Sequence, residues 1–520
     1  GLKGLVDPRG GEGLGRIEAP GLHRHGQDER AHDRRGRQKA REHEGIVMPD
    51  RVLQFRQAVG RLLHETNAVR HSQSRAEGFG KPVKQRIPPR GLARRQLRWS
   101  LGAIADQIAF GITESPPGRA VELKSDGAHD AFLTAPIELR AGVTLLIDRG
   151  VVLFGSRNPR DYDLLPGVCG TITERGHGCT ALITGTNVAS TAIMGDGIID
   201  GRGGERMLGQ DLTWWQLAAQ GRPHALQNNP RMIVFAGCDN AVLYRIQLRN
   251  SPNFHVSYSG GDGFTVWGVI IGVPANAHNA DGIDIGQPWP VVPRATTNVT
   301  VTHTFIHAGD DIVALKAPLG YLTSHVTVAH NHFYTGHGMS IGSATSGGVT
   351  AVRVFDLTID GAANAFHIKS NVKLGGYVHD VQFDDVLVRN SRNPLFIETH
   401  YDSSGHEVDG DDPHHPPQFT DIRFNDVSIQ GGGKITLDGF NAAHRLGVTL
   451  RHFMLDRPDA YQVVADHADL KFEGCNIPAT GEDVTVTGAA AATAVASLAS
   501  TDRFVPFPVA LSVFDNPRKP

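Results

Sequence analysis

"VTVTHTFI" (299–306), "VTVAHNHF" (326–333) and "VRVFDLTI" (352–359) share nearly the same order of apolar and polar residues. Related stretches begin further along and further back in the chain, at residues 242, 264, 381, 422 and 448, and most of the spacings are 22 to 29 residues. Short strands that recur at such a period, without amphipathic helices between them, are typical of a solenoid. A leucine-rich frame is missing, and a propeller blade needs a longer unit. The pattern therefore favours an all-β chain folded as a right-handed parallel β-helix.

The composition agrees with a chain of strands and turns. Its 520 residues include 61 glycines and 29 prolines but only 6 methionines, which favours a turn-rich β protein over a helical one. One short helix is expected over "TWWQLA" (213–218), as a cap that packs aromatic side chains on the solenoid.

The front end of the chain has a different character. Residues 1–113 are rich in arginine and histidine and show no sustained strand or helix period. We expect a basic segment of low order there, ahead of a β-helix domain over 114–520. A nucleic-acid-binding arm and a segment foreign to the folded enzyme are the alternatives for this region.

Charge and hydropathy narrow the classes of partner. The formal net charge is −3, with +11 in residues 1–100 and −14 in the remainder. An acidic body argues against nucleic acid as the main partner. No apolar run reaches the ~20 residues of a membrane span, and no signal-peptide pattern is visible at Gly1.

The four cysteines leave one structural question open. Cys169 and Cys179 flank a short loop and could form a disulfide in an oxidising compartment. Spacing alone does not determine the pairing. A zinc site would need further ligands at finger-like spacing, which the sequence lacks.

A second set of strands carries the charged residues. We aligned it on apolar positions with steps of 27, 29, 27, 29 and 29 residues, namely Val256, Ile283, Ile312, Met339, Ile368 and Ile397. Equivalent positions in consecutive coils of a β-helix stack about 4.8 Å apart. Each aligned residue should therefore lie directly beside the next.

Charged side chains flank the aligned positions in successive coils. The columns two before, one before and one after are Asp281, Asp310 and His337; His255, Asp311 and His367; and Asp284, Ser340, Lys369 and Glu398. Because side chains alternate along a strand, the last two columns are expected to face solvent together. Strict alternation would turn the first column inward, unless the preceding turns release it. Turn chemistry explains any single aspartate, whereas three carboxylates with a histidine and a lysine indicate a functional site.

Four ordered motifs carry a resemblance to a known family. "NADGIDI" (279–285), "GDD" (309–311), "GHG" (336–338) and "HIK" (367–369) follow one another at one-coil spacing. They closely resemble the N-T-D, G/Q-D-D, G/S-H-G and R-I-K motifs of the polygalacturonases, the family-28 glycoside hydrolases, which fold as right-handed parallel β-helices. The likeness covers roughly residues 115–515, and Tyr401 matches a tyrosine of that family.

The resemblance implies roles for the clustered residues. Glycoside hydrolysis needs a carboxylic acid for the leaving oxygen and a carboxylate that activates water. Asp310 would be the general acid, and Asp281 and Asp311 would deprotonate the water, with inversion at the anomeric carbon. Neighbouring carboxylates raise one another's pKa, which keeps one of them protonated, and His337 would sustain this pattern. The substrate contacts implied by the resemblance are Asn279, Asp284, His367, Lys369 and Tyr401, with Lys369 on the galacturonate carboxylate.

The same resemblance implies the setting of the enzyme. We expect a secreted or periplasmic monomer that acts on pectin or homogalacturonan and needs no metal or cofactor. Trp289, in "GQPWP", is the candidate for stacking on a sugar ring.

Two departures from the family pattern leave the substrate open. Ala280 replaces a threonine, and His367 replaces an arginine. Arginine binds a carboxylate bidentately and is always charged, and histidine is neither. The alternatives are weaker binding of polygalacturonate, binding only at low pH, or a modified pectin such as rhamnogalacturonan. The rival classes are a Ca²⁺-dependent pectate lyase with Lys369 as its base, and a non-catalytic carbohydrate-binding β-helix.

Overall fold

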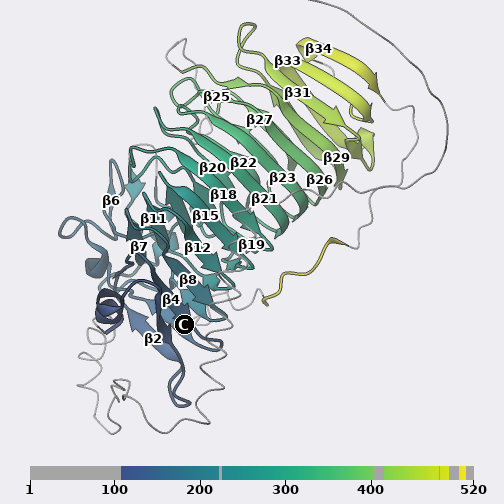
Figure 1. Ribbon diagram of the computed structural model, residues 1–520. Coiled ribbons are helices and arrows are strands. Elements are labelled where there is room, and N and C mark those ends of the chain that lie inside the picture. The colour runs from purple at the N-terminus through teal and green to yellow at the C-terminus, as the bar shows by residue number, and fades with distance from the viewer. Residues whose placement is uncertain (1–106, 222–224, 402–414, 479–480, 491–502, 511–520) are drawn as a thin grey trace, which may run out of the picture. The chain divides into compact units, whose positions relative to one another are not determined.

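Parallel strands of successive coils pair with one another along the described chain, and in Figure 1 they follow in sequence order from β2 to β34. The prediction of an all-β, right-handed parallel β-helix is confirmed. The computed structural model describes residues 107–221, 225–401, 415–478, 481–490 and 503–510. They belong to the second of two units of the chain, Gly1–Arg90 and Gly91–Pro520. Most of the predicted basic segment lies outside the described residues; a helix over 107–114 places Ile108 and Ile112 in the core.

Most of the described strands belong to one hydrogen-bonded sheet, which divides into three parallel stacks that we call sheets 1, 2 and 3. Long strands such as β21 contribute to two of these stacks. Sheet 1 contains β3 (Ile137–Glu138), β7 (Ile183–Thr186), β11 (Ile233–Ala236), β14 (Val256–Ser259), β17 (Ile283–Ile285), β20 (Asp311–Leu315), β22 (His337–Ile341), β24 (Asn364–Lys369), β27 (Asn393–Glu398), β30 (Gly433–Asp438) and the start of β33 (Tyr461–Cys475).

Sheet 2 contains β1 (Arg119–Leu123), β4 (Val143–Ile147), β8 (Ala192–Gly195), β12 (Ala241–Tyr244), β15 (Asp262–Trp267), β18 (Thr296–Thr302), β21 (Thr323–Phe333), β23 (Val349–Asp360), β26 (Val381–Arg389), β29 (Ile422–Gln430), β31 (Leu446–Arg451), the end of β33 and β34 (Gly481–Ala490).

Sheet 3 contains β2 (Ala131–Thr134), β5 (Val152–Gly155), β9 (Ile198–Asp200), β13 (Gln247–Arg249), β16 (Ile270–Gly272), β19 (Phe305–His307), the ends of β21, β23, β26 and β29, and β32 (Met454–Leu455). Short pairs join the loops, β6 (Ile172–Thr173) with β10 (Leu226–Gln227) and β25 (Tyr377–Val378) with β28 (Gln418–Phe419).

Sheet 2 has the register that the repeat predicts. The pairing joins the first residues of seven of the eight repeated stretches in turn, namely Phe264, Val299, Val326, Val352, Val381, Ile422 and Val448. Only the first stretch is shifted by one residue, because Ala241 and not Val242 pairs with Phe264. Two positions further on, a ladder of fully buried side chains fills the core, namely Leu243, Val266, Val301, Val328, Val354, Phe383, Phe424 and Leu450.

Sheet 1 departs from the predicted register at three steps. Val313, and not Ile312, pairs with both Ile283 and Met339, and Met339 pairs with Phe366 instead of Ile368. Every residue of β20 is buried, and a continuous apolar run has no period-2 phase from which a register can be deduced. Asp311, and not Asp310, therefore lies beside His337, and Asp310 belongs to the preceding turn.

The predicted cap helix is present as α3 (Trp214–Ala218). Thr213 and Gln216 close a capping box at its start, which satisfies backbone N–H groups that a helix leaves unpaired. Trp214 is fully buried and packs edge-on against Tyr162.

The open question about the cysteines is answered by a Cys169–Cys179 disulfide. Cys238 and Cys475 are buried free thiols. Among the described residues, no helix combines the length and apolar character needed to cross a lipid bilayer.

Candidate active site

The charged motifs meet on β17, β20, β22 and β24 of sheet 1, where Asp311 and His337 begin β20 and β22 and Lys369 ends β24. The pairing there passes from Asp311–His337 to Val313–Met339 without a pair between, so the regular alternation of side chains is interrupted. Glycine permits this irregular backbone because a Cβ on Gly282 would lie 2.3 Å from the Ile312 carbonyl oxygen. His337, which strict alternation would turn inward, lies beside the outward Asp311, as the preceding turns were expected to allow.

Three carboxyl groups form the centre of the site. Oxygens of Asp281, Asp310 and Asp311 lie within 4.8 Å of one another. Asp281 is 3% exposed, and the side chains of Asp310 and Asp311 are 23% and 5% exposed. Like charges at this separation do not all ionise readily in a partly dry site. We call these three residues the carboxyl trio.

Asp311 is the most heavily partnered member of the trio. Lys369 Nζ lies 3.1 Å and 3.2 Å from its two oxygens, and Ser340 Oγ donates a hydrogen bond of 2.8 Å. Burial opposes ionisation, but Lys369 and the nearby histidines outweigh it and hold the pKa of Asp311 well below its usual range. Asp311 is therefore an anion in the free site.

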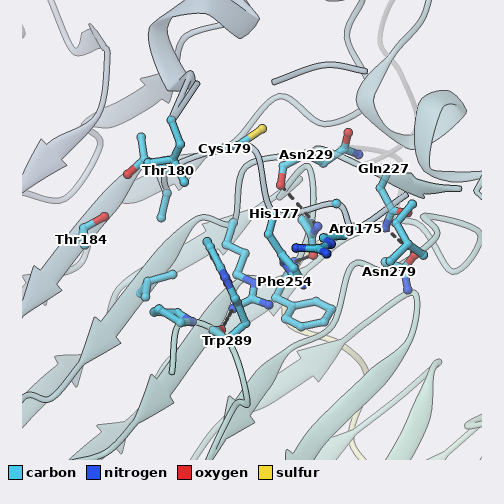
Figure 2. A pocket seen from close by; sticks show the side chains of 18 residues that line it. Arg175, His177, Cys179, Thr180, Thr184, Gln227, Asn229, Phe254, Asn279 and Trp289 are labelled. Atoms are coloured by element: carbon cyan, nitrogen blue, oxygen red, sulfur yellow. Dashed lines mark hydrogen bonds between the residues drawn. The ribbon is translucent and has the colours of Figure 1, made fainter. Parts of the chain in front are cut away.

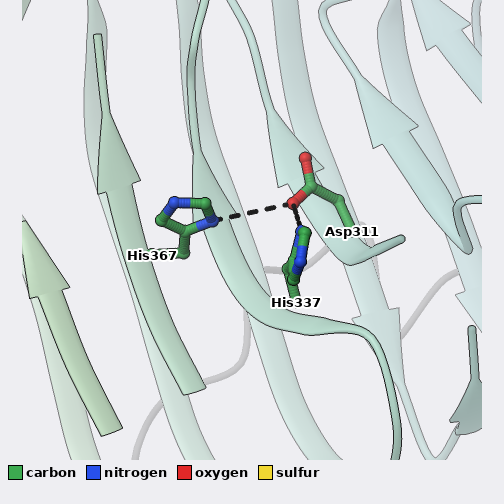
Figure 3. Close-up of side chains that lie close together, drawn as sticks. All are labelled: Asp311, His337 and His367. Atoms are coloured by element: carbon green, nitrogen blue, oxygen red, sulfur yellow. Dashed lines mark ion pairs between the residues drawn. The ribbon is translucent and has the colours of Figure 1, made fainter. Parts of the chain in front are cut away.

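His337 connects Asp310 with Asp311. Its Nδ1 lies 3.2 Å from Asp310 Oδ1 and 3.5 Å from Asp311 Oδ1, and Figure 3 shows it beside the Asp311 carboxylate. Burial disfavours the imidazolium, but the two carboxylates outweigh it and raise the pKa of His337 to about 9. A protonated His337 lowers the pKa of Asp310 in turn, against the effect of burial.

Asp281 is the carboxyl that keeps a proton. Burial raises its pKa well above the usual range, and the charges of Asp284 and Asp310 raise it further. Among the described residues, its buried Oδ1 has no hydrogen-bond partner. Within the trio, a proton is therefore most favoured on Asp281.

His367 is buried and neutral. Its ring stacks on Phe396 at 5.3 Å and meets Tyr401 edge-on, and its Nδ1 lies 3.9 Å from Asp311 Oδ1. Burial and the charge of Lys369 lower the pKa of His367 to about 3. At mildly acidic and neutral pH this position therefore carries no cation comparable to an arginine.

The remaining predicted contacts surround the trio. Lys369 Nζ lies 5.1 Å over the ring of Tyr401. Asn279 Nδ2 lies 3.5 Å from Asp310 Oδ2, at the limit of a hydrogen bond. Asp284 is fully buried, so it presents no surface to a substrate.

A second ion pair, absent from the sequence prediction, holds Asp284. Lys316 Nζ lies 2.5 Å from Asp284 Oδ1, which also accepts a 2.5 Å hydrogen bond from Gln287 Nε2. Lys316 follows Leu315 as Lys369 follows Ile368, and Leu315 and Ile368 both pair with Ile341. Comparison of "VALK" with "FHIK" is the signal that could have found it.

The expectation that these groups face solvent together was wrong. Asp284, Asp311, His367 and Lys369 do lie outside the core, but they are no more than 4% exposed. Ion pairs and stacked rings cover them, and the dry surroundings produce the large pKa shifts.

Known proteins are similar in sequence to this chain. The profile of the glycosyl hydrolases family 28 matches residues 133–465. An endo-polygalacturonase of Pectobacterium carotovorum subsp. carotovorum is 40% identical over 349 residues, which cover 66% of this chain and 82% of that protein. A polygalacturonase of Ralstonia nicotianae is 34% identical over 447 residues, which cover 74% of this chain and 81% of that protein.

Solved structures share the fold. A polygalacturonase from Erwinia carotovora ssp. carotovora has a TM-score of 0.62 and 34% identity, and the match covers 74% of this chain and 93% of that one. An exopolygalacturonase from Thermotoga maritima, at 19% identity, has a TM-score of 0.57 over 72% of this chain and 87% of its own, a likeness of fold alone. The family profile spans most of the β-helix, and this chain, a glycosyl hydrolase, belongs to family 28 of that class.

Proposed function

We propose that this glycosyl hydrolase cleaves the α-1,4-galacturonosyl linkages of polygalacturonate, the backbone of pectin. The carboxyl trio carries the proposal, because its oxygens lie within 4.8 Å of one another next to the cation of Lys369. Carboxyl groups supply general acid and base, and a cation suits a uronate substrate. The polygalacturonase names of the relatives support the same substrate.

Asp310 is the general acid in this proposal. It is the most exposed of the trio, and so the one that a leaving oxygen can reach. In the free site the proton resides on Asp281, and the two groups are close enough to titrate as a pair. A bound galacturonate carboxylate raises the pKa of Asp310 by repulsion and draws the proton onto it. Asp281 is then ionised and, with Asp311, takes the proton of the attacking water.

Inversion follows from the partners of the two possible nucleophiles. Separations below about 5.5 Å are usual for enzymes that form a glycosyl ester, and the trio is that close. Asp311 has both oxygens bound by Lys369, and Asp281, although ionised once substrate is bound, is only 3% exposed, so neither is well placed as a nucleophile. Direct attack by water, with inversion, is the remaining route.

A modified pectin is the second candidate substrate, and His367 favours it. With a pKa of about 3, His367 stays neutral at working pH, which removes the alternative of uronate binding through a protonated His367 at mildly acidic pH. A neutral donor or acceptor suits a sugar hydroxyl. Rhamnogalacturonan offers such a sugar next to galacturonate.

We further propose that the enzyme acts outside the cytoplasm, secreted or periplasmic, as a monomer. The Cys169–Cys179 disulfide supports this setting, because disulfides persist in oxidising compartments. A polymeric pectin substrate, which does not enter cells, supports it as well.

The test follows new reducing ends and unsaturated-uronide absorbance on polygalacturonate and on rhamnogalacturonan, for the natural chain and Asp310→Asn. We expect reducing ends without unsaturation, release of the inverted anomer by proton NMR, and loss of activity in the variant. Unsaturated product would contradict hydrolysis, and turnover confined to rhamnogalacturonan would favour the second candidate.

A further inference from the structure

A cavity of about 340 Å³ lies beside the carboxyl trio, within the usual size range of small-molecule sites. Asn279 links the two, since it lines the cavity and its Nδ2 lies 3.5 Å from Asp310 Oδ2. Gln227 Nε2 donates a 2.8 Å hydrogen bond to Asn279 Oδ1, and Figure 2 shows these two amides together at one side of the cavity. A substrate at the trio can therefore extend into the cavity.

The charge of this cavity is opposite to that of the trio. Its described lining includes Arg175, His177 and Arg231 but no aspartate or glutamate. Burial and the charge of Arg231 lower the pKa of His177, so the positive charge resides on the two arginines. The trio on the other side of Asn279 is acidic. An anionic group is attracted to the cavity and repelled by the trio.

Arg231 is a buried cation on which the charges of Asp284 and Asp281 act, but only from beyond ion-pair distance. It is 9% exposed, and its Nη1 donates a 2.6 Å hydrogen bond to the Trp289 carbonyl. No described carboxylate oxygen lies within 4.0 Å of its guanidinium. A guanidinium has five N–H donors, and this single bond leaves others for a ligand. Buried charges are ordinarily paired, because an unpaired charge is costly to desolvate.

Aromatic rings hold the guanidinium in place. The Arg231 guanidinium carbon lies 4.7 Å from the centre of the Phe254 ring and 5.6 Å from that of Trp289. Trp289, expected to stack on a sugar, instead stacks on His177 at 4.5 Å. The tryptophan is therefore part of a rigid wall, and Arg231 is pre-ordered for a bidentate partner.

We propose that the cavity binds the carboxylate of a second galacturonate unit, adjacent to the sugar at the trio, with Arg231 as its anchor and Arg175 at its rim. This inference rests on the proposed function. A carboxylate matches the guanidinium bidentately, and the amides of Asn279 and Gln227 provide polar contacts for the sugar between. The site would select pectin whose carboxyl at this unit is free over pectin whose carboxyl is methyl-esterified.

The experiment measures kcat and KM on polygalacturonate and on pectin of equal chain length with half its carboxyls methyl-esterified. Arg231→Met should raise KM for polygalacturonate about 10- to 100-fold, as expected for the loss of a charged hydrogen-bonded pair. KM for the esterified pectin should change much less, so the selectivity between the two substrates falls. Arg231→Lys keeps the charge but loses the bidentate guanidinium, so its KM for polygalacturonate should lie between those of the natural chain and Arg231→Met. Arg175→Gln should raise this KM about 2- to 5-fold.

Arg119→Gln, on the exposed start of β1, is the matched control for loss of one positive charge, and thermal unfolding checks each variant. A purely structural Arg231 would lower activity on both substrates equally, and an unchanged selectivity in every folded variant overturns the proposal. If Arg231→Met does not fold, the selectivity of Arg231→Lys and Arg175→Gln between the two substrates tests the proposal. Turnover of polygalacturonate by the natural chain separates the outcomes, because its absence would overturn the proposed function as well.

Discussion

Two buried aspartate–lysine pairs lie on the same sheet, and they behave differently. Asp284 with Lys316 and Asp311 with Lys369 have 0% and 5% exposed carboxyl side chains. The pKa of Asp284 is raised, mainly by burial, whereas that of Asp311 lies well below the usual range. Burial and pairing with lysine are common to both, so neither explains the difference.

The number of hydrogen-bond and ion-pair partners explains why the pKa values of Asp284 and Asp311 shift in opposite directions. Lys316 and Gln287 both contact Oδ1 of Asp284, and its buried Oδ2 has no partner among the described residues. Asp311 has Lys369 on both oxygens, with Ser340 and His337 besides. An anion in a dry site is stable only where its lone pairs are met by donors. We infer that Asp311 takes part in acid–base catalysis as a stable anion, whereas Asp284 positions Lys316 and its neighbours.

The largest expected effect tests this division of labour directly. Asp311→Asn should lower kcat on polygalacturonate about 10²- to 10⁴-fold, because an acid–base group is lost. Asp284→Asn, of the same shape and charge change, should lower it by about tenfold or less, since we infer that Asp284 only positions Lys316 and its neighbours. Initial rates of reducing-end release measure both, with circular dichroism as the folding control. Equal losses of kcat in the two variants would contradict the different roles inferred for Asp311 and Asp284.

A smaller effect is expected when the lysines are replaced. Lys369→Met should reduce the free energy of unfolding by about 3–5 kcal/mol, because it leaves a buried anion uncompensated. Lys316→Met should cost less, since Asp284 can take a proton. Urea unfolding at pH 7 and pH 5 measures this, and the Lys316→Met deficit should shrink at the lower pH. A deficit that is independent of pH would mean that Asp284 stays ionised.

The smallest effect concerns His337, which contacts only the Asp311 side of the comparison. Its pKa is about 9 in the fold, above the ordinary 6.5, so its stabilisation is complete below pH 6.5 and is lost as pH rises through 9. Allowing for solvent screening of a one-third exposed side chain, we expect about 1 kcal/mol. The melting temperature of the natural chain minus that of His337→Gln should fall across this interval. A constant difference would place the pKa of His337 near its ordinary value.

Much of the fold was predictable from local pattern. The spacing from Phe264 to Val448 agrees with the pairing of sheet 2. In these strands apolar and polar residues alternate, so the sequence shows which positions face the core. The uniformly buried β20, with an unbroken apolar run from Ile312 to Leu315, has no such alternation, and there the predicted register was off by one residue. Lys316 could have been found from "VALK". Arg231 precedes a strand as a lone arginine, and no sequence signal indicates that its guanidinium is buried beside a cavity.

The sequence by itself determined the coil repeat, the order of the four motifs and the identity of the acidic cluster, because each depends on residues within one strand or on a regular step between coils. Only the tertiary structure decided which aspartate most favours a proton, that His367 is neutral and that Arg231 faces a cavity whose described lining has no acidic side chain. These properties depend on desolvation and on charges contributed by several coils. They arise only when those coils are brought together.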